Sequence, residues 1–222
     1  MAVPGEHHPA FEEYCETIFE LREDDLDVIQ ARIAERLRVS RPSVSEMIKR
    51  MSDESLIEVA GGKITLTVSG EELAVRVVRR HRIAERFITD ILGLSWSLAH
   101  REAGRWEHVM SHEVETAMSR LLGEPTTCPH GNPIPGSGYI PPTAMKLSEL
   151  STGQEFTVSR IPEELEFTPG MLEFLETSHL VPGSHGTVQT GTGTGTGDMT
   201  VLVDGTSVTV DSFATLRILV TV

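Results

Sequence analysis

Residues 28–68 decide the fold of this chain and read VIQARIAERLRVSRPSVSEMIKRMSDESLIEVAGGKITLTV. Apolar residues recur at spacings of three and four from 28 to 37 and again from 43 to 55, which predicts two helices. Between them, Ser40 is suited to cap the second helix and Pro42 to stand in its first turn. This stretch therefore predicts two short helices joined by a tight turn.

A predicted hairpin follows the two helices. The β-like runs 56–59 and 63–68 flank the pair Gly61-Gly62, a pattern typical of two antiparallel strands with a glycine turn. Helix, turn, helix and hairpin in this order are typical of a winged helix-turn-helix, whose second helix enters the major groove of DNA.

Charge is distributed unevenly along the chain. The 222 residues hold 19 Lys and Arg against 33 Asp and Glu, a formal net charge of -14, and bulk charge of this sign argues against a polyanionic partner. Residues 1–27 and 87–222 are acidic, whereas residues 28–86 hold twelve basic and eight acidic residues. Bases concentrated on the predicted winged unit favour DNA binding, although a solvated helix face would also explain them.

Composition and the N-terminal segment predict a soluble cytoplasmic protein. Hydrophobic residues make up 39% of the chain, and no apolar run approaches the ~18 residues that a membrane-spanning helix needs. The first ten residues lack the basic and apolar regions of a signal peptide. Cys15 and Cys128 are too few for a disulfide framework and indicate a reducing compartment. We expect no membrane association.

The rest of the chain predicts a helical unit and then a β-rich unit. A helix at 11–22 precedes the winged stretch, and further helices are expected at 70–92 and within 96–122. A Pro- and Gly-rich segment, 124–142, is expected to be an extended linker. After it, strands are expected at 155–161, 199–203, 207–210 and 216–222. A helix is expected at 168–178, and the Gly-Thr repeat at 191–197 is expected to be a flexible loop.

Histidines and carboxylates recur on the central helices. His81 and Glu85 are four residues apart and share a helix face, and His100, Glu107 and His108 follow on the next helical stretch. Imidazoles and carboxylates on facing helices are suitable ligands for a divalent transition metal. An ordinary exposed position is the alternative for each residue taken alone.

Two other classes of function would each explain part of the sequence. A winged-helix regulator of a small organic ligand would leave the His and Glu residues incidental. A metallohydrolase would leave the winged unit unexplained, and the sequence contains no HExxH, GxSxG or P-loop motif. We therefore expect a protein that is not an enzyme.

Four strings carry a close resemblance to the diphtheria toxin repressor family of iron- and manganese-responsive bacterial regulators. They are ARIAERL at 31–37, HRIAER at 81–86, EAGRWEHVM at 102–110 and GNPIPG at 131–136. The resemblance is strong over residues 12–136 and weak beyond them. It implies an α+β protein with three units: a winged-helix DNA-binding domain at 1–72, a helical metal-binding and dimerisation domain with a Pro-rich linker at 73–144, and an SH3-like β-barrel at 145–222.

The resemblance also implies two metal sites. One would use His81, Glu85 and His100, completed by Glu163 and Glu166. The other would use Glu107 and His108 together with Glu13 on the N-terminal helix, and Glu16 is an additional candidate ligand.

The second implied site departs from the iron regulators. Their sulfur ligands, a Met and a Cys, are replaced here by Glu13 and Gly104, and Gly104 offers only its backbone carbonyl. Oxygen ligands suit Mn²⁺ better than softer ions. The prediction is therefore Mn²⁺, with Fe²⁺ as the alternative.

In the implied recognition helix, Ser40, Pro42 and Glu46 stand where the family contacts bases. The iron regulators have Gln in place of Glu46, and a carboxylate prefers to accept a hydrogen bond from a cytosine amino group. The implied function is a metal-activated repressor whose homodimer binds a pseudo-palindromic double-stranded DNA operator and controls metal-homeostasis genes. The full set of expected DNA-contacting residues is Arg32, Ser40, Arg41, Pro42, Ser43, Ser45, Glu46, Lys49 and Arg50.

Overall fold

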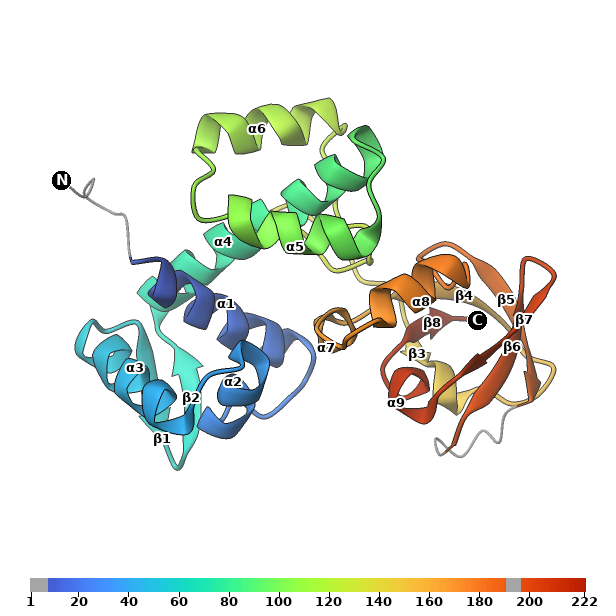
Figure 1. Cartoon of the computed structure of the whole chain (residues 1–222), viewed down its shortest axis with the longest axis horizontal. Coiled ribbons are helices and arrows are strands. Elements are labelled where there is room, and N and C mark those ends of the chain that lie inside the picture. The colour runs from blue at the N-terminus through green and yellow to red at the C-terminus, as the bar shows by residue number, and fades with distance from the viewer. Residues whose placement is uncertain (1–7, 191–196) are drawn as a thin grey trace.

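The computed structural model describes residues 8–190 and 197–222, and they form three units around a common centre (Figure 1). The first unit contains the helix-turn-helix and its hairpin, the second is helical, and the third is built on a sheet. The predicted α+β class is confirmed.

The winged unit is built as the sequence predicts. The two hairpin strands pair antiparallel, with Val59 opposite Ile64. Val44, Ile48 and Met51 are buried against the first two helices, so the opposite side of the third helix faces outward. The elements are α1 (Pro9–Glu23), α2 (Gln30–Leu37), α3 (Arg41–Asp53), β1 (Ile57–Ala60) and β2 (Lys63–Leu66).

The turn between α2 and α3 follows from three residues. Arg38 adopts a left-handed conformation with φ 54° and ends α2. The Ser40 hydroxyl accepts a hydrogen bond from the backbone N–H of Ser43 at 3.2 Å and caps α3. Pro42 stands in the first turn of α3, where a missing N–H costs nothing.

One long helix joins the winged unit to the helical unit. Leu73 and Val77, in the first half of α4 (Val68–Arg86), pack in the winged core, whereas Ala84 packs against Ala103. The expected domain boundary after residue 72 thus falls within a continuous helix. The helical unit continues with a π-helix, η1 (Phe87–Ile91), and then α5 (Trp96–Trp106) and α6 (His112–Leu121).

The third unit is a six-stranded antiparallel sheet with the order β3-β8-β4-β5-β6-β7, compatible with an SH3-like fold. Sequence patterns missed the short β3, the polar β5 and the four-residue helices α7 and α9, and the strand expected at 216–222 is limited to Leu219–Thr221. The expected loop at 191–197 lies almost entirely outside the described residues. The elements are β3 (Met145–Lys146), the 3-10 turn η2 (Leu147–Glu149), β4 (Glu155–Arg160), α7 (Glu163–Glu166), α8 (Met171–Thr177), β5 (His185–Thr190), β6 (Met199–Val203), β7 (Thr206–Val210), α9 (Ser212–Thr215) and β8 (Leu219–Thr221).

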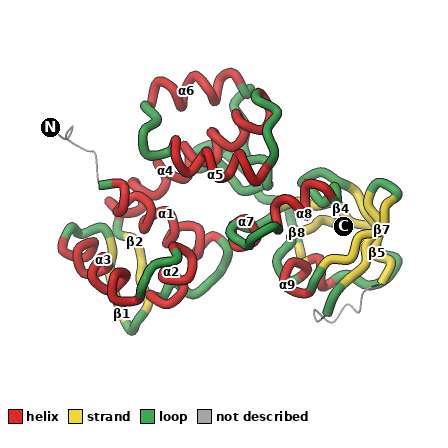
Figure 2. Tube along the Cα trace, in the orientation of Figure 1, coloured by secondary structure: helices red, strands yellow, loops and turns green. Residues whose placement is uncertain are grey.

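The Pro- and Gly-rich segment is more than a spacer, which corrects the expectation of an extended linker. It runs as loop between the helical unit and the sheet (Figure 2), and Cys128, His130 and Asn132 are fully buried within it. The Asn132 amide donates to the carbonyl of Ile161 at 3.0 Å. This segment therefore forms part of the junction between two units. None of the described helices has the length and apolar character needed to cross a bilayer.

Candidate metal centre and DNA-binding surface

The N-terminal helix contributes buried carboxylates to a first group of ligand-type side chains. Glu12 and Glu16 are one helical turn apart, and both are buried. Glu12 Oε2 lies 2.7 Å from His108 Nδ1, and Glu107 Oε1 lies 3.2 Å from His108 Nε2. Glu16 Oε1 is 3.9 Å from His81 Nδ1. We call Glu12, Glu16, Glu107 and His108, with Nδ1 of His81, the α1 cluster.

A second group lies where α4, α5, α7 and the Pro-rich segment meet. Glu85 Oε1 is 3.2 Å from His81 Nε2 and 3.0 Å from His100 Nδ1. Glu166 Oε2 is 3.2 Å from His100 Nδ1 and 2.9 Å from His130 Nδ1. We call Glu85, His100, His130 and Glu166, with Nε2 of His81, the α7 cluster.

His81 stands between the two clusters and contributes one ring nitrogen to each. Its Nδ1 lies 2.5 Å from Glu107 Oε2, and its Nε2 lies 3.3 Å from His100 Nδ1. The residue is 6% exposed, so neither ring nitrogen is free to turn to solvent. A single imidazole therefore links the two groups.

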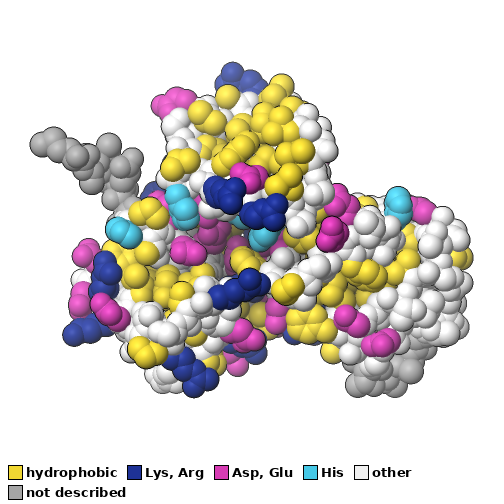
Figure 3. Space-filling model, viewed as in Figure 1, with side chains coloured by type: hydrophobic (Ala, Val, Ile, Leu, Met, Phe, Trp, Pro, Cys, Tyr) yellow, Lys and Arg dark blue, Asp and Glu magenta, His cyan; other side chains and the backbone are white. Residues whose placement is uncertain are grey.

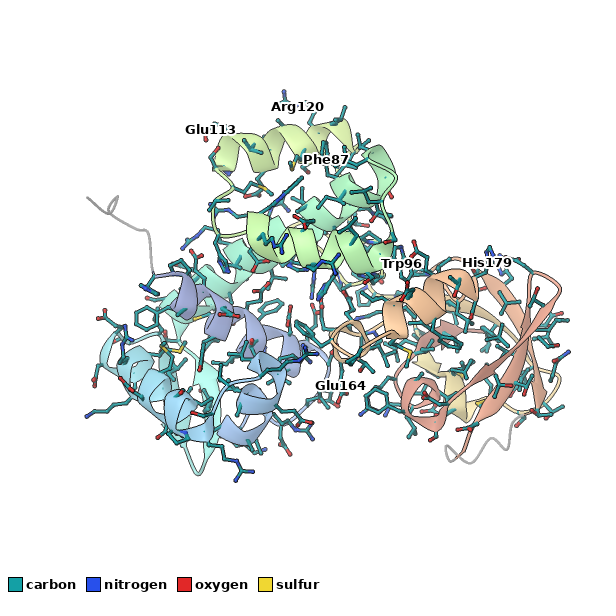
Figure 4. The ribbon with its side chains drawn as sticks, in the orientation of Figure 1. Phe87, Trp96, Glu113, Arg120, Glu164 and His179 are labelled. Carbon is teal, nitrogen blue, oxygen red and sulfur yellow. The ribbon has the colours of Figure 1, made fainter. Side chains whose placement is uncertain are left out.

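Cys128 and His130 extend the α7 cluster. Cys128 Sγ lies 3.8 Å from His130 Nδ1, and that nitrogen lies 3.5 Å from Glu85 Oε2. Sulfur and nitrogen ligands of one tetrahedral cation stand about 3.5 Å apart, so this spacing is close to that of a shared ion. The ring of Trp96, which lies where α5 approaches α8 (Figure 4), meets the His130 ring edge-on at 4.5 Å.

The polar atoms buried in the clusters fit a cation. Among the described residues, Glu16 Oε1 is buried without a hydrogen-bond partner, and the buried Glu85 Oε2 and Glu166 Oε2 face only histidine ring nitrogens, which are themselves ligand-type atoms. Leaving a buried charged acceptor without a hydrogen bond is costly. Oxygen and nitrogen atoms converging in this way are suitable ligands for a divalent metal ion, and the residues present fit such an ion.

The carboxylates hold protons on the histidines of the α7 cluster. Burial alone would lower the pKa of His100, but hydrogen bonds to Glu166 and Glu85 outweigh it and raise the pKa to about 9. For His81, the charges of Glu85 and Glu107 likewise outweigh burial and raise the pKa well above its ordinary value. In return, His130 and His81 outweigh burial and hold the pKa of Glu85 well below its usual range.

The α1 cluster has an excess of carboxylates. Burial raises the pKa of Glu16 well above its ordinary value, and the neighbouring charges of Glu107 and Glu20 add to the effect. The hydrogen bond to Glu12 raises the pKa of His108. A cation placed here would take over the role of the protons that these groups share.

The structure places the predicted ligands unequally. His81, Glu85, His100 and Glu166 meet in the α7 cluster, and Glu16, Glu107 and His108 meet in the α1 cluster. Glu13 is exposed, and its neighbour Glu12 takes the place facing His108. Glu163 lies within reach of His100 and Glu166, but its carboxylate also pairs with the buried Arg82 at 2.9 Å.

Open space surrounds Gly104, where the iron regulators carry a sulfur ligand. A Cβ atom built at this position would meet no atom within 4 Å. The sequence prediction missed Glu12, Cys128 and His130. The only signal for the last two was a Cys and a His two residues apart, directly before the GNPIPG string.

The outer face of α3 presents most of the predicted DNA contacts. Lys and Arg side chains, interspersed with acidic ones, line the outer rim of this unit (Figure 3). Arg32 on α2 is half-buried, and the hydroxyls of Ser40 and Ser43 lie 2.8 Å apart within the helix cap. The predicted contacts that are exposed on α3 are Arg41, Pro42, Ser43, Ser45, Glu46, Lys49 and Arg50.

Comparison with known proteins identifies the family. The family model described as the iron dependent repressor N-terminal DNA binding domain matches residues 8–63, and the one described as the iron dependent repressor metal binding and dimerisation domain matches residues 67–136. The chain is 38% identical over 206 residues to the iron-dependent repressor IdeR of Mycobacterium tuberculosis, covering 87% of this chain and 88% of that protein. The chain belongs to the iron-dependent repressor family.

Other relatives of this repressor support the assignment. It is 48% identical over 126 residues to the diphtheria toxin repressor of Corynebacterium diphtheriae, which covers 56% of each chain. A solved manganese-dependent transcriptional repressor in complex with manganese is 32% identical, with a TM-score of 0.83 and coverage of 95% of this chain and 99% of that one. The manganese regulator SloR is 28% identical, with a TM-score of 0.76 and coverage of 97% and 99%.

Family membership settles the general function. This repressor is a metal-dependent transcriptional regulator with a DNA-binding domain and a metal-binding and dimerisation domain, and its family is not one of enzymes. Neither a regulator of a small organic ligand nor a metallohydrolase is supported.

Proposed function

We propose that Mn²⁺ is the corepressor of this protein, with Fe²⁺ as the alternative. In this proposal the metal-bound homodimer recognises a pseudo-palindromic operator in double-stranded DNA, acts in the cytoplasm and controls metal-homeostasis genes. The observation that supports Mn²⁺ best is the α1 cluster, which consists of carboxylates and imidazoles without sulfur. Hard ligands of this kind favour Mn²⁺ over softer ions.

The sulfur of Cys128 lies beside the α7 cluster, away from the DNA-binding unit. Cys128 contacts His130, a member of the α7 cluster that belongs to the Pro-rich segment and not to a helix. We expect the α1 cluster to select the ion that controls DNA binding. The α7 cluster, with Cys128 beside it, would accept a wider range of divalent ions.

The α1 cluster is connected to the recognition helix through the winged core. Tyr14 and Ile18 of α1 are buried in the same core as Val44 and Ile48 of α3, so α1 and α3 move together. Without a cation, the buried carboxylates of α1 and Glu107 must keep protons between them to avoid repulsion across the junction with α5. A bound divalent ion supplies the positive charge that removes this repulsion.

Fixing α1 against α5 and the C-terminal half of α4 would set the position of α3 in each protomer. In a homodimer, this fixes the separation of two recognition helices, which must match half-sites about one helical turn of DNA apart. The metal would thus shift a pre-existing equilibrium toward the DNA-binding arrangement.

On the DNA, basic residues at the edge of the recognition helix would hold phosphates while its exposed middle faces bases. Arg32, Arg41, Lys49 and Arg50 are the proposed phosphate contacts, which predicts an affinity that falls steeply with salt. Glu46 is exposed on α3 and would accept from a cytosine amino group. Ser40 and Ser43 share a cap hydrogen bond, so we expect them to contribute mainly to helix position.

The test begins with an operator obtained by selecting random duplexes on the Mn²⁺-bound protein. Fluorescence anisotropy then compares operator affinity at equal free concentrations of Mn²⁺, Co²⁺, Zn²⁺ and, under anaerobic conditions, Fe²⁺. We expect Mn²⁺ to give the tightest complex. Tighter binding with Fe²⁺ would reverse the choice of metal, and equal binding without any metal would reject the proposal.

Adjacent glutamates provide a matched pair of variants. Glu12→Gln removes a buried charge from the α1 cluster, and we expect it to weaken Mn²⁺ binding by about tenfold or more, as loss of a metal-supporting carboxylate does. Glu13→Gln changes an exposed side chain and should leave Mn²⁺ affinity within about twofold. If Glu13→Gln gives the larger loss, Glu13 is the ligand, as the resemblance implied.

A further inference from the structure

Arg36, at the C-terminal end of α2, lies at the junction of the three units. Its Nη1 donates to Glu20 Oε2 at 3.2 Å, and the two side chains are only 5% and 4% exposed. On its other side, the guanidinium carbon lies 4.4 Å from the centroid of the Phe167 ring, a distance typical of a cation–π contact.

Each partner of Arg36 leads directly to one metal cluster. Glu20 stands one turn after Glu16 on α1, and Glu16 belongs to the α1 cluster. Phe167 follows Glu166 in the chain, and its ring meets the ring of His100 edge-on at 5.1 Å. Glu166 and His100 both belong to the α7 cluster, so one side chain of the DNA-binding unit contacts the neighbours of both clusters.

Arg36 lies beside a cleft, and a second connection between the DNA-binding unit and the α7 segment runs through Asp24, which accepts hydrogen bonds from Arg160 at 2.6 Å and from the backbone N–H of Glu164 at 3.2 Å. A cleft of about 530 Å³ separates α2 from α5 and α8 here, lined by residues that include Ser97, Arg101 and Glu173. This centre is visible as a hollow where the three units meet (Figure 3). Besides the contact between Arg36 and the Phe167 ring, Arg38, directly after α2, donates a hydrogen bond from Nη2 to the carbonyl of Phe167, directly after α7, at 3.4 Å. Among the described residues, Arg36 Nη2 has no hydrogen-bond partner.

We propose, on the basis of the function proposed above, that Arg36 is a positioning residue through which both metal clusters orient the DNA-binding unit. Ile33 and Ala34 of α2 share a buried core with Val44 of α3, so a constraint on α2 passes to the recognition helix. Occupation of the α1 cluster fixes Glu20, and occupation of the α7 cluster fixes Phe167. Arg36 then holds α2 between two fixed partners.

The test measures the coupling between Mn²⁺ binding and operator binding. Operator affinity is determined with Mn²⁺ and with excess chelator, and the ratio of the two is compared between wild type, Arg36→Gln and Phe167→Leu. Phe167→Leu keeps an apolar side chain but removes the π face, so it should fold even if Arg36→Gln does not. We expect each variant to lower the ratio by about fivefold, the factor that a part-buried cation–π contact is worth.

Two further readouts separate positioning from a general structural defect. Mn²⁺ stoichiometry measured without DNA should match wild type, because neither Arg36 nor Phe167 supplies a ligand to a cluster. By thermodynamic reciprocity, the gain in Mn²⁺ affinity caused by operator should fall by the same factor as the operator ratio. Phe167→Tyr, which keeps the π face, should restore both values.

Arg41→Gln is the matched control. Arg41 is exposed on α3 and contacts neither cluster, so its loss should weaken operator binding equally with and without metal. An unchanged ratio in both Arg36→Gln and Phe167→Leu, with wild type responding to Mn²⁺, would overturn the role of Arg36. No response to metal in wild type would instead reject the proposed function.

Discussion

Affinity for Mn²⁺ should depend strongly on pH, because protons occupy the ligands when the metal is absent. The pKa of His100 is raised to about 9, so at pH 7 only about 1% of this imidazole is neutral. A metal ion must displace this proton to use the nitrogen. The raised pKa stabilises the protonated form at lower pH, so metal affinity falls as pH falls.

The expected size follows from the same pKa. Below about pH 9 each pH unit changes the neutral fraction tenfold, so Kd for the ion at the α7 cluster should fall about 100-fold between pH 6 and pH 8, or about 2.7 kcal/mol. The pKa of His130 is also raised well above its ordinary value, since Glu166 and Glu85 outweigh burial. Displacing its proton as well would make the dependence steeper.

Calorimetry and electron paramagnetic resonance provide the assay. The signal of free Mn²⁺ reports Kd at each pH, and titrations in two buffers of different ionisation enthalpy count the protons released. We expect at least one proton for each ion bound at the α7 cluster. A change in Kd below about threefold per pH unit, or binding without proton release, would refute the assignment of His100 as a ligand held by a proton.

Three substitutions test other parts of the structure. His81→Ala should weaken Mn²⁺ binding at both clusters by about 100-fold or more, measured as Mn²⁺ bound per chain. The control His179→Ala changes an exposed residue and should bind Mn²⁺ as wild type does. If one cluster of His81→Ala kept full affinity, His81 would serve only the other cluster. Ser40→Ala should lower the free energy of unfolding by about 1 kcal/mol, measured by urea denaturation, and Ser40→Asp, which preserves the cap, should not. Glu46→Gln should shift base preference at one operator position from cytosine toward adenine, a change of about 1–3 kcal/mol, measured on operators that differ at that base pair; unchanged preference would show that Glu46 contacts no base.

The winged unit could be predicted from the sequence because its signals are local. Ser40, Pro42 and the Gly61-Gly62 pair fix the ends of elements through backbone geometry within a few residues. Most elements missed in the third unit lack such signals. The strand 185–190 is largely polar, and the helix 163–166 is a single turn whose carboxylates face other units.

The sequence predicted those candidate ligands whose positions depend on the local spacing of residues along helices. Residues on α4 and α5 share helix faces, so spacing and resemblance together brought His81, Glu85 and His100 into one site. The choice between Glu12 and Glu13 depends on how α1 is rotated about its own axis, which tertiary packing decides. His130 belongs to the α7 cluster because the segment before GNPIPG is buried between units. The composition of that segment predicted only a linker.

Titration of operator binding with free Mn²⁺, followed by removal of the ion with excess chelator, tests the central claim most directly. We predict that operator affinity rises by at least tenfold as Mn²⁺ is added, within the range of known allosteric couplings of about 5- to 150-fold, and returns to its starting value with chelator. Equal affinity before, during and after exposure to Mn²⁺ would contradict the claim that the two clusters control DNA binding.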